Sequence, residues 1–303
     1  MSFPIVYPTQ RHLLIRRGFR VWTIVVVVAI AVVMAAALVR LKAQESELVF
    51  RTQASQDRAM AASPLDAALR VSIPTADGNE LAGILLRATS ERNTGFWILH
   101  LHGNADSAFS ERQRQHIEVL RGLGFSVLAF DYRGFGLSPG KASEANMYQD
   151  AQAGYQYLVR SGAMPKSIIL WGHSLGGGPA TYLAAQNKAA ALVLFGAFTS
   201  IPDAAQDTYP YLPVKWVASI QFDSLARMAD VHIPVLVAHS ISDATIHYHH
   251  AQELFAAANP PKELLPLRTA PDGFGGHVQA LYDRPDLIAE RLSKLLGSEI
   301  RQF

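Results

Sequence analysis

The sequence of 303 residues predicts an α/β fold, a doubly wound and mostly parallel sheet, preceded by one N-terminal transmembrane helix. Three observations support this prediction. Short apolar runs alternate with helical patterns from about residue 66 onward. Residues 21–39 contain only one polar side chain, that of Thr23. A serine between two glycines, in Gly172-His173-Ser174-Leu175-Gly176, directly follows the apolar run 167–171.

The apolar run 21–39 has the length of a membrane-spanning helix. As a helix it would be about 28 Å long, close to the roughly 30 Å hydrocarbon core of a bilayer. More cations precede it (Arg11, Arg16, Arg17, Arg20) than follow it (Arg40, Lys42). This asymmetry favours a cytoplasmic N-terminus with the rest of the chain outside. The alternative is a cleaved signal peptide, with 35–37 as the peptidase site and a secreted product, but signal peptides have shorter apolar runs.

The chain divides into a basic segment 1–20, the transmembrane helix 21–39, a juxtamembrane linker 40–65 and a globular domain 66–303. Within that domain, residues 199–230 are long enough only for a short cap. A formal charge of +2 and no basic stripe exclude a nucleic-acid partner. The absence of cysteine excludes a thiol nucleophile, disulfides and a thiolate zinc site.

The domain begins with a predicted hairpin, because the apolar runs 69–73 and 81–87 bracket the turn residues Asp77-Gly78-Asn79. The other apolar runs have the length of buried strands, at 96–101, 125–130, 167–171, 191–195, 233–238 and 264–268. Helical patterns lie between or after them, at 107–122, 143–161, 175–186, 248–258 and 278–296. Strands separated by helices pair in parallel, so the sheet is expected to be mostly parallel with an antiparallel start.

Ser174 is the candidate nucleophile. A glycine on each side allows the strand, the serine backbone and the next helix to approach closely at a sharp turn. Such a turn exposes the hydroxyl group and leaves the N–H of Leu175 free at a helix N-terminus, where an oxyanion can be held. The alternative is a glycine-rich turn without chemistry.

A serine nucleophile needs a base, and the base needs an acid that orients it. Asp243 follows the strand 233–238, and His277 follows the strand 264–268, so both are expected at the carboxyl edge of the sheet. The order Ser174, Asp243, His277 is that of a catalytic triad on this architecture. Alternatives are an ordinary loop carboxylate and a surface histidine at these positions. The rival bases, His247, His249 and His250, are interpreted as a solvated helix start without a metal, and the rival acid Asp272 lies too near His277.

The second oxyanion donor is expected in the loop after the strand 96–101. There, His102-Gly103-Asn104 would direct the N–H of Asn104 toward the same point as the N–H of Leu175. Gly103 allows the backbone to approach a substrate. The side chain of His102 is expected to be a buried brace for the loop.

Three of these motifs together resemble the α/β-hydrolase superfamily: His102-Gly103-Asn104, the segment Asp131-Tyr132-Arg133-Gly134-Phe135-Gly136-Leu137-Ser138, and the serine turn. The resemblance covers about residues 66–296. The run Phe198-Thr199-Ser200-Ile201 and the segment 209–213 resemble a membrane-tethered branch with lysophospholipase-like and protein-depalmitoylating members. One departure is Ser240, where many relatives have glycine in H-G-x-x-D.

The resemblance and the residues predict a membrane-anchored serine hydrolase that cleaves a carboxylic ester or thioester through an acyl-enzyme, without cofactor or metal. Its substrate would be a small acyl ester or lipid-like molecule, held by cap aromatics (Tyr209, Tyr211, Trp216 and Phe222). The alternatives are a peptidase on the same fold and a catalytically silent membrane scaffold. A fragment that begins near residue 60 is expected to be soluble and active. Acyl length and oligomeric state are left open.

Overall fold

The computed structural model describes residues 8–63, 66, 69–89, 91, 93–268, 276–277 and 284–297. A sheet of eight strands forms the centre of the domain, in the order β1-β2-β4-β3-β5-β6-β7-β8. The strands are β1 (Arg70–Pro74), β2 (Glu80–Leu86), β3 (Trp97–Leu101), β4 (Ser126–Phe130), β5 (Ile168–His173), β6 (Ala191–Phe195), β7 (Val235–Ser240) and β8 (Lys262–Leu267). All eight coincide with predicted runs to within a few residues.

The pairing confirms the predicted sheet. The hairpin β1–β2 is antiparallel, and β2 also pairs with β4 in antiparallel orientation, with Gly83 opposite Phe130. From β4 through β3 to β8 all pairs are parallel. The central strands β4, β5 and β6 are buried along their whole length, as expected for strands covered on both faces.

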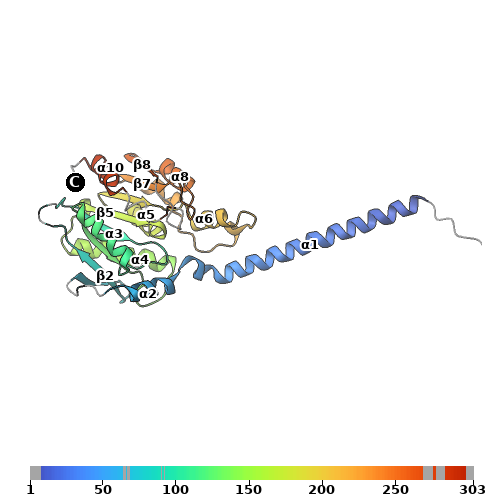
Figure 1. The fold of residues 1–303 in the computed structure, drawn as a ribbon, viewed down its shortest axis with the longest axis horizontal. Coiled ribbons are helices and arrows are strands. Elements are labelled where there is room, and N and C mark those ends of the chain that lie inside the picture. Colours follow the sequence, from blue (N-terminus) through green and yellow to red (C-terminus); the bar gives the residue numbers. More distant parts are fainter. Residues whose placement is uncertain are drawn as a thin grey trace, which may run out of the picture.

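Helices cover both faces of the sheet (Figure 1). Apolar side chains of α3 (Glu111–Gly122) and α10 (Pro285–Leu296) belong to the core on one face. Those of α4 (Glu144–Arg160), α5 (Gly177–Gln186) and α8 (His249–Ala257) belong to the core on the other. Helix starts follow the local sequence: Ser110 and Ser143 accept the backbone N–H groups of Gln113 and Asn146 and so cap α3 and α4.

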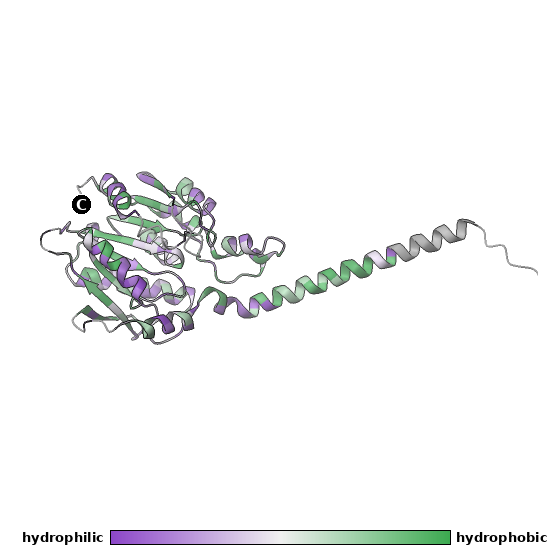
Figure 2. Ribbon diagram, viewed as in Figure 1, coloured by the Kyte–Doolittle hydropathy of each residue, from purple (hydrophilic) through white to green (hydrophobic). Residues whose placement is uncertain are grey.

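The predicted apolar segment 21–39 lies inside a longer helix, α1 (Pro8–Val49), which projects away from the domain (Figure 1). Its middle is apolar and the end nearest the domain is mixed in polarity (Figure 2). Among the residues that the structure describes, α1 is the helix that has the length and composition to cross a membrane. The apolar side chains of its segment 21–39 are largely exposed.

The segment expected as a linker is helical and packs on the domain. After α1 ends at Val49, helix α2 (Thr52–Ala61) begins almost at once. Phe50 is buried and lies edge-on to the ring of Phe222, with ring centroids 6.2 Å apart. Ser55 is also buried: its hydroxyl donates to the carbonyl of Asp106 and accepts the N–H of Gly136 at 2.9 Å. Because these contacts are long-range, the local polarity of 40–65 did not reveal them.

The cap region contains short helices: α6 (Ile201–Thr208), η4 (Val214–Trp216), α7 (Ser224–Arg227) and η5 (Met228–Asp230). Ser200 caps α6 by accepting the N–H of Asp203. Helix α6 projects from the side of the domain from which α1 leaves (Figure 1).

Candidate active site

Ser174 sits at a strained turn between β5 and the helical segment η3 (Ser174–Gly176) that leads into α5. Its φ angle is +51°, a left-handed conformation that is uncommon for a residue with a side chain. A Cβ atom on Gly172 would lie 2.6 Å from the carbonyl oxygen of Gly176, and one on Gly176 would overlap the carbonyl oxygen of Leu101. Both glycines are therefore required by close approach, as the sequence predicted.

The structure brings Ser174, His277 and Asp243 together in one hydrogen-bonded chain. Nε2 of His277 lies 2.9 Å from Oγ of Ser174, and Nδ1 of His277 lies 2.6 Å from Oδ2 of Asp243. His277 is in the segment after β8 and Asp243 in the turn after β7, so all three groups lie at the carboxyl edge of the sheet. With the proton of the neutral ring on Nδ1, Nε2 can accept the proton of the serine hydroxyl.

Asp243 is held as a carboxylate by four neighbours. Oδ1 accepts the N–H groups of Thr245 and Ile246 at 2.8 and 2.9 Å, and Nε2 of His239 lies 3.2 Å from Oδ2. Burial raises the pKa of Asp243, but the hydrogen bonds, first those from His239 and His277, outweigh it and hold the pKa below its ordinary value. Sequence analysis missed His239. Its position at the carboxyl end of a strand, four residues before Asp243, was the available signal.

The serine at position 240 does not displace the acid loop. Ser240 is the last residue of β7, in extended backbone that any residue can adopt, so this chain needs no glycine there. The turn that follows carries Asp243 to within 2.6 Å of His277.

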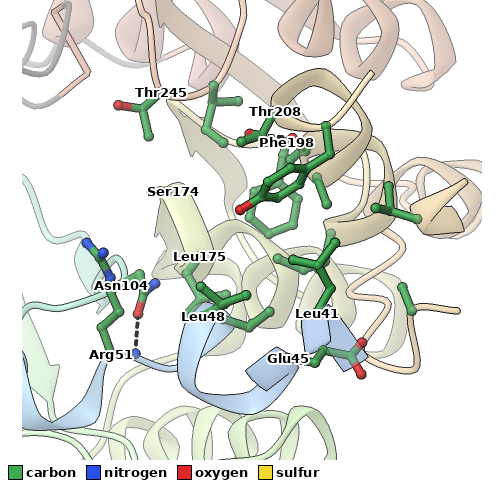
Figure 3. Close-up of a pocket in the computed structure, with 18 of the residues that line it drawn as sticks. Leu41, Glu45, Leu48, Arg51, Asn104, Ser174, Leu175, Phe198, Thr208 and Thr245 are labelled. Carbon is green, nitrogen blue, oxygen red and sulfur yellow. Dashed lines mark hydrogen bonds between the residues drawn. The ribbon is translucent and has the colours of Figure 1, made fainter. Parts of the chain in front are cut away.

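Asn104 and Leu175 both line the pocket next to Ser174. The side-chain oxygen of Asn104 accepts two backbone N–H groups, those of Ala105 and Arg51, each at 2.9 Å (Figure 3). The loop is therefore tied to the junction between α1 and α2. His102 is buried as expected, with Nδ1 2.9 Å from the carbonyl oxygen of Gly103.

A pocket of about 440 Å³ opens beside Ser174, and most of its lining is apolar. One wall belongs to the end of α1, and the opposite wall belongs to the cap (Figure 3). The α1 wall consists of Leu41, Lys42, Glu45, Leu48 and Val49, and the cap wall of Ile201, Ala204, Ala205, Thr208, Tyr209, Val214, Val217 and Ala218. The contribution of α1 was absent from the sequence-based expectation.

The expectation for the four cap aromatics is correct for Tyr209, which lines the pocket. Phe222 does not line the pocket but is buried in the core, against Phe50. Tyr211 and Trp216 point away from the core, with exposed fractions of 90% and 88%.

Residues 97–216 match the sequence profile described as the alpha/beta hydrolase fold. Uncharacterized protein Rv2307c of Mycobacterium tuberculosis is 36% identical over 78% of this chain and 83% of its own length. The chain belongs to the α/β-hydrolase family. Its sheet order and serine turn agree with that membership.

Two further relatives have names that state an activity or a domain. Lysophosphatidylserine lipase ABHD12 of Danio rerio is 35% identical over 55% of this chain and 48% of its own length. Human alpha/beta hydrolase domain-containing protein 17B is 28% identical over 75% of this chain and 74% of its own length. Among solved structures, the Pyrococcus furiosus esterase Pf2001 superposes with a TM-score of 0.62 over 80% of this chain and 98% of its own, at 22% identity, which supports the fold.

The hydrolase segment 131–138 holds loops rather than lining the pocket. Buried Asp131 accepts the hydroxyl of Ser107 at 2.9 Å and the N–H groups of Ala108 and Leu137 at 2.7 and 2.8 Å. Its carboxylate thus fastens the end of the loop that contains Asn104 to the loop after β4.

Three buried histidines lie in a row behind Ser174, on β3 (His100), α3 (His116) and β5 (His173). Successive ring centroids are 6.3 and 6.0 Å apart, and the ring of His173 lies 5.5 Å from that of His277. Burial lowers the pKa of His100 and of His116 to about 3, and that of His173 well below its ordinary value. These rings are therefore neutral at pH 7.

The rival bases gather around Asp207 of α6 and not around Ser174. Oδ2 of Asp207 lies 3.3 Å from His247, 2.7 Å from His249 and 3.1 Å from His250. The interpretation as a solvated helix start is wrong for His250, which is buried with Nδ1 2.8 Å from the hydroxyl of Thr199.

This cluster joins the cap helix α6 to α8. Asp207, His249 and His250 have the donor types and spacing of a metal site, with ligand atoms within 4.8 Å of one another, but direct hydrogen bonds already connect them. Asp272, the rival acid, lies outside the residues that the structure describes.

Proposed function

We propose that this α/β-hydrolase is a membrane-anchored serine hydrolase that cleaves a carboxylic ester or thioester of an acyl or lipid-like substrate. The observation that carries the proposal is the hydrogen-bonded chain from Ser174 through His277 to Asp243, with the serine facing an apolar pocket. No cofactor is needed for this chemistry.

The proposed reaction has two half-reactions. His277 Nε2 takes the hydroxyl proton while Ser174 Oγ forms a bond to the acyl carbon, and the negative charge moves to the carbonyl oxygen. The N–H groups of Asn104 and Leu175 are the proposed donors to that oxygen. Collapse breaks the bond to the alcohol or thiol, which takes the proton from His277. Water then attacks the acyl-enzyme with His277 again as base, releasing the acid and restoring Ser174.

The apolar pocket favours an acyl group over a peptide. Each methylene group transferred from water into such a site contributes about 0.8 kcal/mol, so long acyl chains gain binding energy there. The named relatives support this substrate class, because one is a lysophosphatidylserine lipase and the structural neighbour is an esterase. A peptidase on the same fold would need polar groups for the peptide backbone, and the pocket lining supplies few.

The proposal is tested with a fluorophosphonate probe, which reacts with activated serines. The unaltered protein should be labelled, and Ser174→Ala should lose labelling and at least about 10³-fold in kcat toward p-nitrophenyl esters. Ser161→Ala, at an exposed serine after α4, is the matched control and should keep both. Labelling that persists in Ser174→Ala would reject the nucleophile, and an unlabelled, inactive native protein would favour the silent scaffold.

Anchoring through α1, with the N-terminus cytoplasmic and the domain outside, is part of the same proposal. Its support is the exposed apolar length of α1 and the arginines before it. The full chain should stay with membranes after washing at high pH with carbonate. A native N-terminus located after Ala37 would instead show a cleaved signal peptide.

A further inference from the structure

The rim of the pocket is made by two segments far apart in the sequence, the end of α1 and the cap segment 211–220. Leu41 and Leu48 of α1 line the pocket together with Val214 and Val217 of the cap. These four side chains give the opening between helix and cap apolar surface on both sides, next to the charged pair Lys42 and Glu45. A lipid chain could lie between them without losing apolar contact.

The cap is fixed to α1 by one carboxylate. Glu45 accepts the N–H of Ser219 at 2.6 Å, the hydroxyl of Ser219 at 2.7 Å and the N–H of Ile220 at 2.9 Å. Lys42 donates to the same carboxylate at 2.9 Å. Hydrogen bonds to a charged acceptor are among the stronger ones, so the position of the cap relative to the helix axis is defined.

The end of the rim at Leu41 reaches the level of the lipid headgroups if α1 spans a bilayer. The apolar run ends at Val39, and the helix rises about 1.5 Å per residue, which places Leu41 about 3 Å and Glu45 about 9 Å beyond that end. The headgroup layer on each side of the hydrocarbon core is about 5–7 Å thick. The opening of the pocket therefore begins within this layer.

The cap carries two exposed aromatic side chains. Tyr211 and Trp216 are almost fully exposed, although large aromatic side chains usually find cover. Ser219 is held to α1 by Glu45, and Trp216 is three residues before it. The Cα atoms of Trp216 and Ser219 are therefore within about 11 Å of each other. The cap and α1 leave the domain on the same side (Figure 1). Tyrosine and tryptophan are the residues preferred at the boundary between lipid and water.

We propose that the cap segment 211–218 docks into the interface of the same bilayer that holds α1. The pocket then opens directly onto the lipid layer, so that the acyl chain of a bilayer lipid passes between α1 and the cap to Ser174 without crossing water. The docking partner is a lipid bilayer, and the substrate class is an acyl lipid already resident in it. This inference rests on the proposed function for its substrate, but not for the docking itself.

Docking is measured without reference to activity. The chain has no cysteine, so Tyr211→Cys gives one site for an environment-sensitive fluorophore in the full chain reconstituted into phosphatidylcholine vesicles. The emission should shift to the blue and should be quenched by brominated lipids. The same label at Ser161→Cys should do neither. Ser161 is exposed at the end of α4, before the strand β5 whose opposite end leads to Ser174. A label at 211 that behaves like the label at 161 would overturn the docking.

The route is tested with the double variant Tyr211→Ser, Trp216→Ser. Cleavage of a monoacyl phospholipid presented in vesicles should fall about tenfold or more, while cleavage of water-soluble p-nitrophenyl butyrate should not change. An equal fall with both substrates, or none with either, would overturn the route. Failure of the proposed function gives a different result from failure of the docking. In that case Ser174→Ala would keep its activity, whatever the label at residue 211 reports.

Discussion

The backbone N–H of Arg51 donates to the side-chain oxygen of Asn104 at 2.9 Å, which joins the α1–α2 junction to the loop beside Ser174. Arg58 of α2 adds a second connection, since its guanidinium donates to the carbonyl of Ala105 at 2.6 Å. The segment that leads from the apolar helix to the domain is thus part of the framework of the site. It cannot be removed without changing the loop that carries Asn104.

Two fragments test this connection. A fragment that begins at residue 40 keeps the α1 wall, Phe50 and the Arg51 contact, so it should retain activity toward soluble esters. A fragment that begins at residue 62 lacks the buried Phe50, a loss of the kind that costs about 3–5 kcal/mol, and lacks the Arg51 N–H that binds the side-chain oxygen of Asn104. Its Tm and kcat/KM should both fall. Equal activity and Tm for the two fragments would reject a role for this segment and restore the expectation of an active fragment from residue 60.

The pocket volume should determine the preferred acyl length. Ala205→Leu adds three carbon atoms to the cap wall, in a helix that tolerates leucine, and should shorten the best ester in a p-nitrophenyl series by about three methylenes. Esters shorter than this limit should keep their kcat/KM. Ala256→Leu makes the same exchange at an exposed position of α8 and should leave the profile unchanged. Brisk cleavage of aminoacyl anilides with a flat ester series would instead favour the peptidase.

Asp243 should act by orienting His277. Asp243→Asn removes the carboxylate that lies 2.6 Å from Nδ1, so the ring is no longer held with its proton on that nitrogen. We expect kcat to fall by about 10⁴-fold, as at other serine triads, with little change in KM. Asp286→Asn, at an exposed position of α10, is the control. Full activity of Asp243→Asn would reassign the acid.

The row of buried histidines predicts acid unfolding. His100, His116 and His173 have a lower pKa in the folded than in the unfolded chain, so the unfolded chain binds more protons as the pH falls below about 6.5. The contribution of the neutral rings to the free energy of unfolding is fully present above that pH. It is lost as the pH falls toward about 3, by up to about 1.4 kcal/mol per pH unit for each histidine. Tm should therefore drop between pH 7.5 and 5.5.

The contribution of one ring can be isolated. His100→Leu replaces a buried imidazole with an apolar side chain and should reduce the slope of unfolding free energy against pH by about a third. His232→Gln, at an exposed position, should leave the slope unchanged. A slope that does not respond to His100→Leu would show that other groups govern acid unfolding.

The strands, most of the helices and the meeting of Ser174, Asp243 and His277 could be predicted from the order of the residues alone. Strands and helices leave periodic patterns of apolar residues, and parallel strands place their following loops at one edge of the sheet. Because all three residues follow parallel strands, they could be expected to lie close together. The glycines around Ser174 were informative for the same local reason, because a sharp turn restricts the residue types within it.

The surroundings of Ser174 could not be predicted in this way, because they depend on contacts made in the folded chain. Glu45 and Ser219 are 174 positions apart, and contacts over such separations leave no periodic trace in either segment. Residues 40–61 are polar enough to suggest a connector, yet they form one wall of the pocket because Phe50 and Ser55 find partners on the folded domain. His250 likewise is buried only because α6 and α8 meet at Asp207. Burial of a polar residue depends on its partner, and the partner is supplied by the fold.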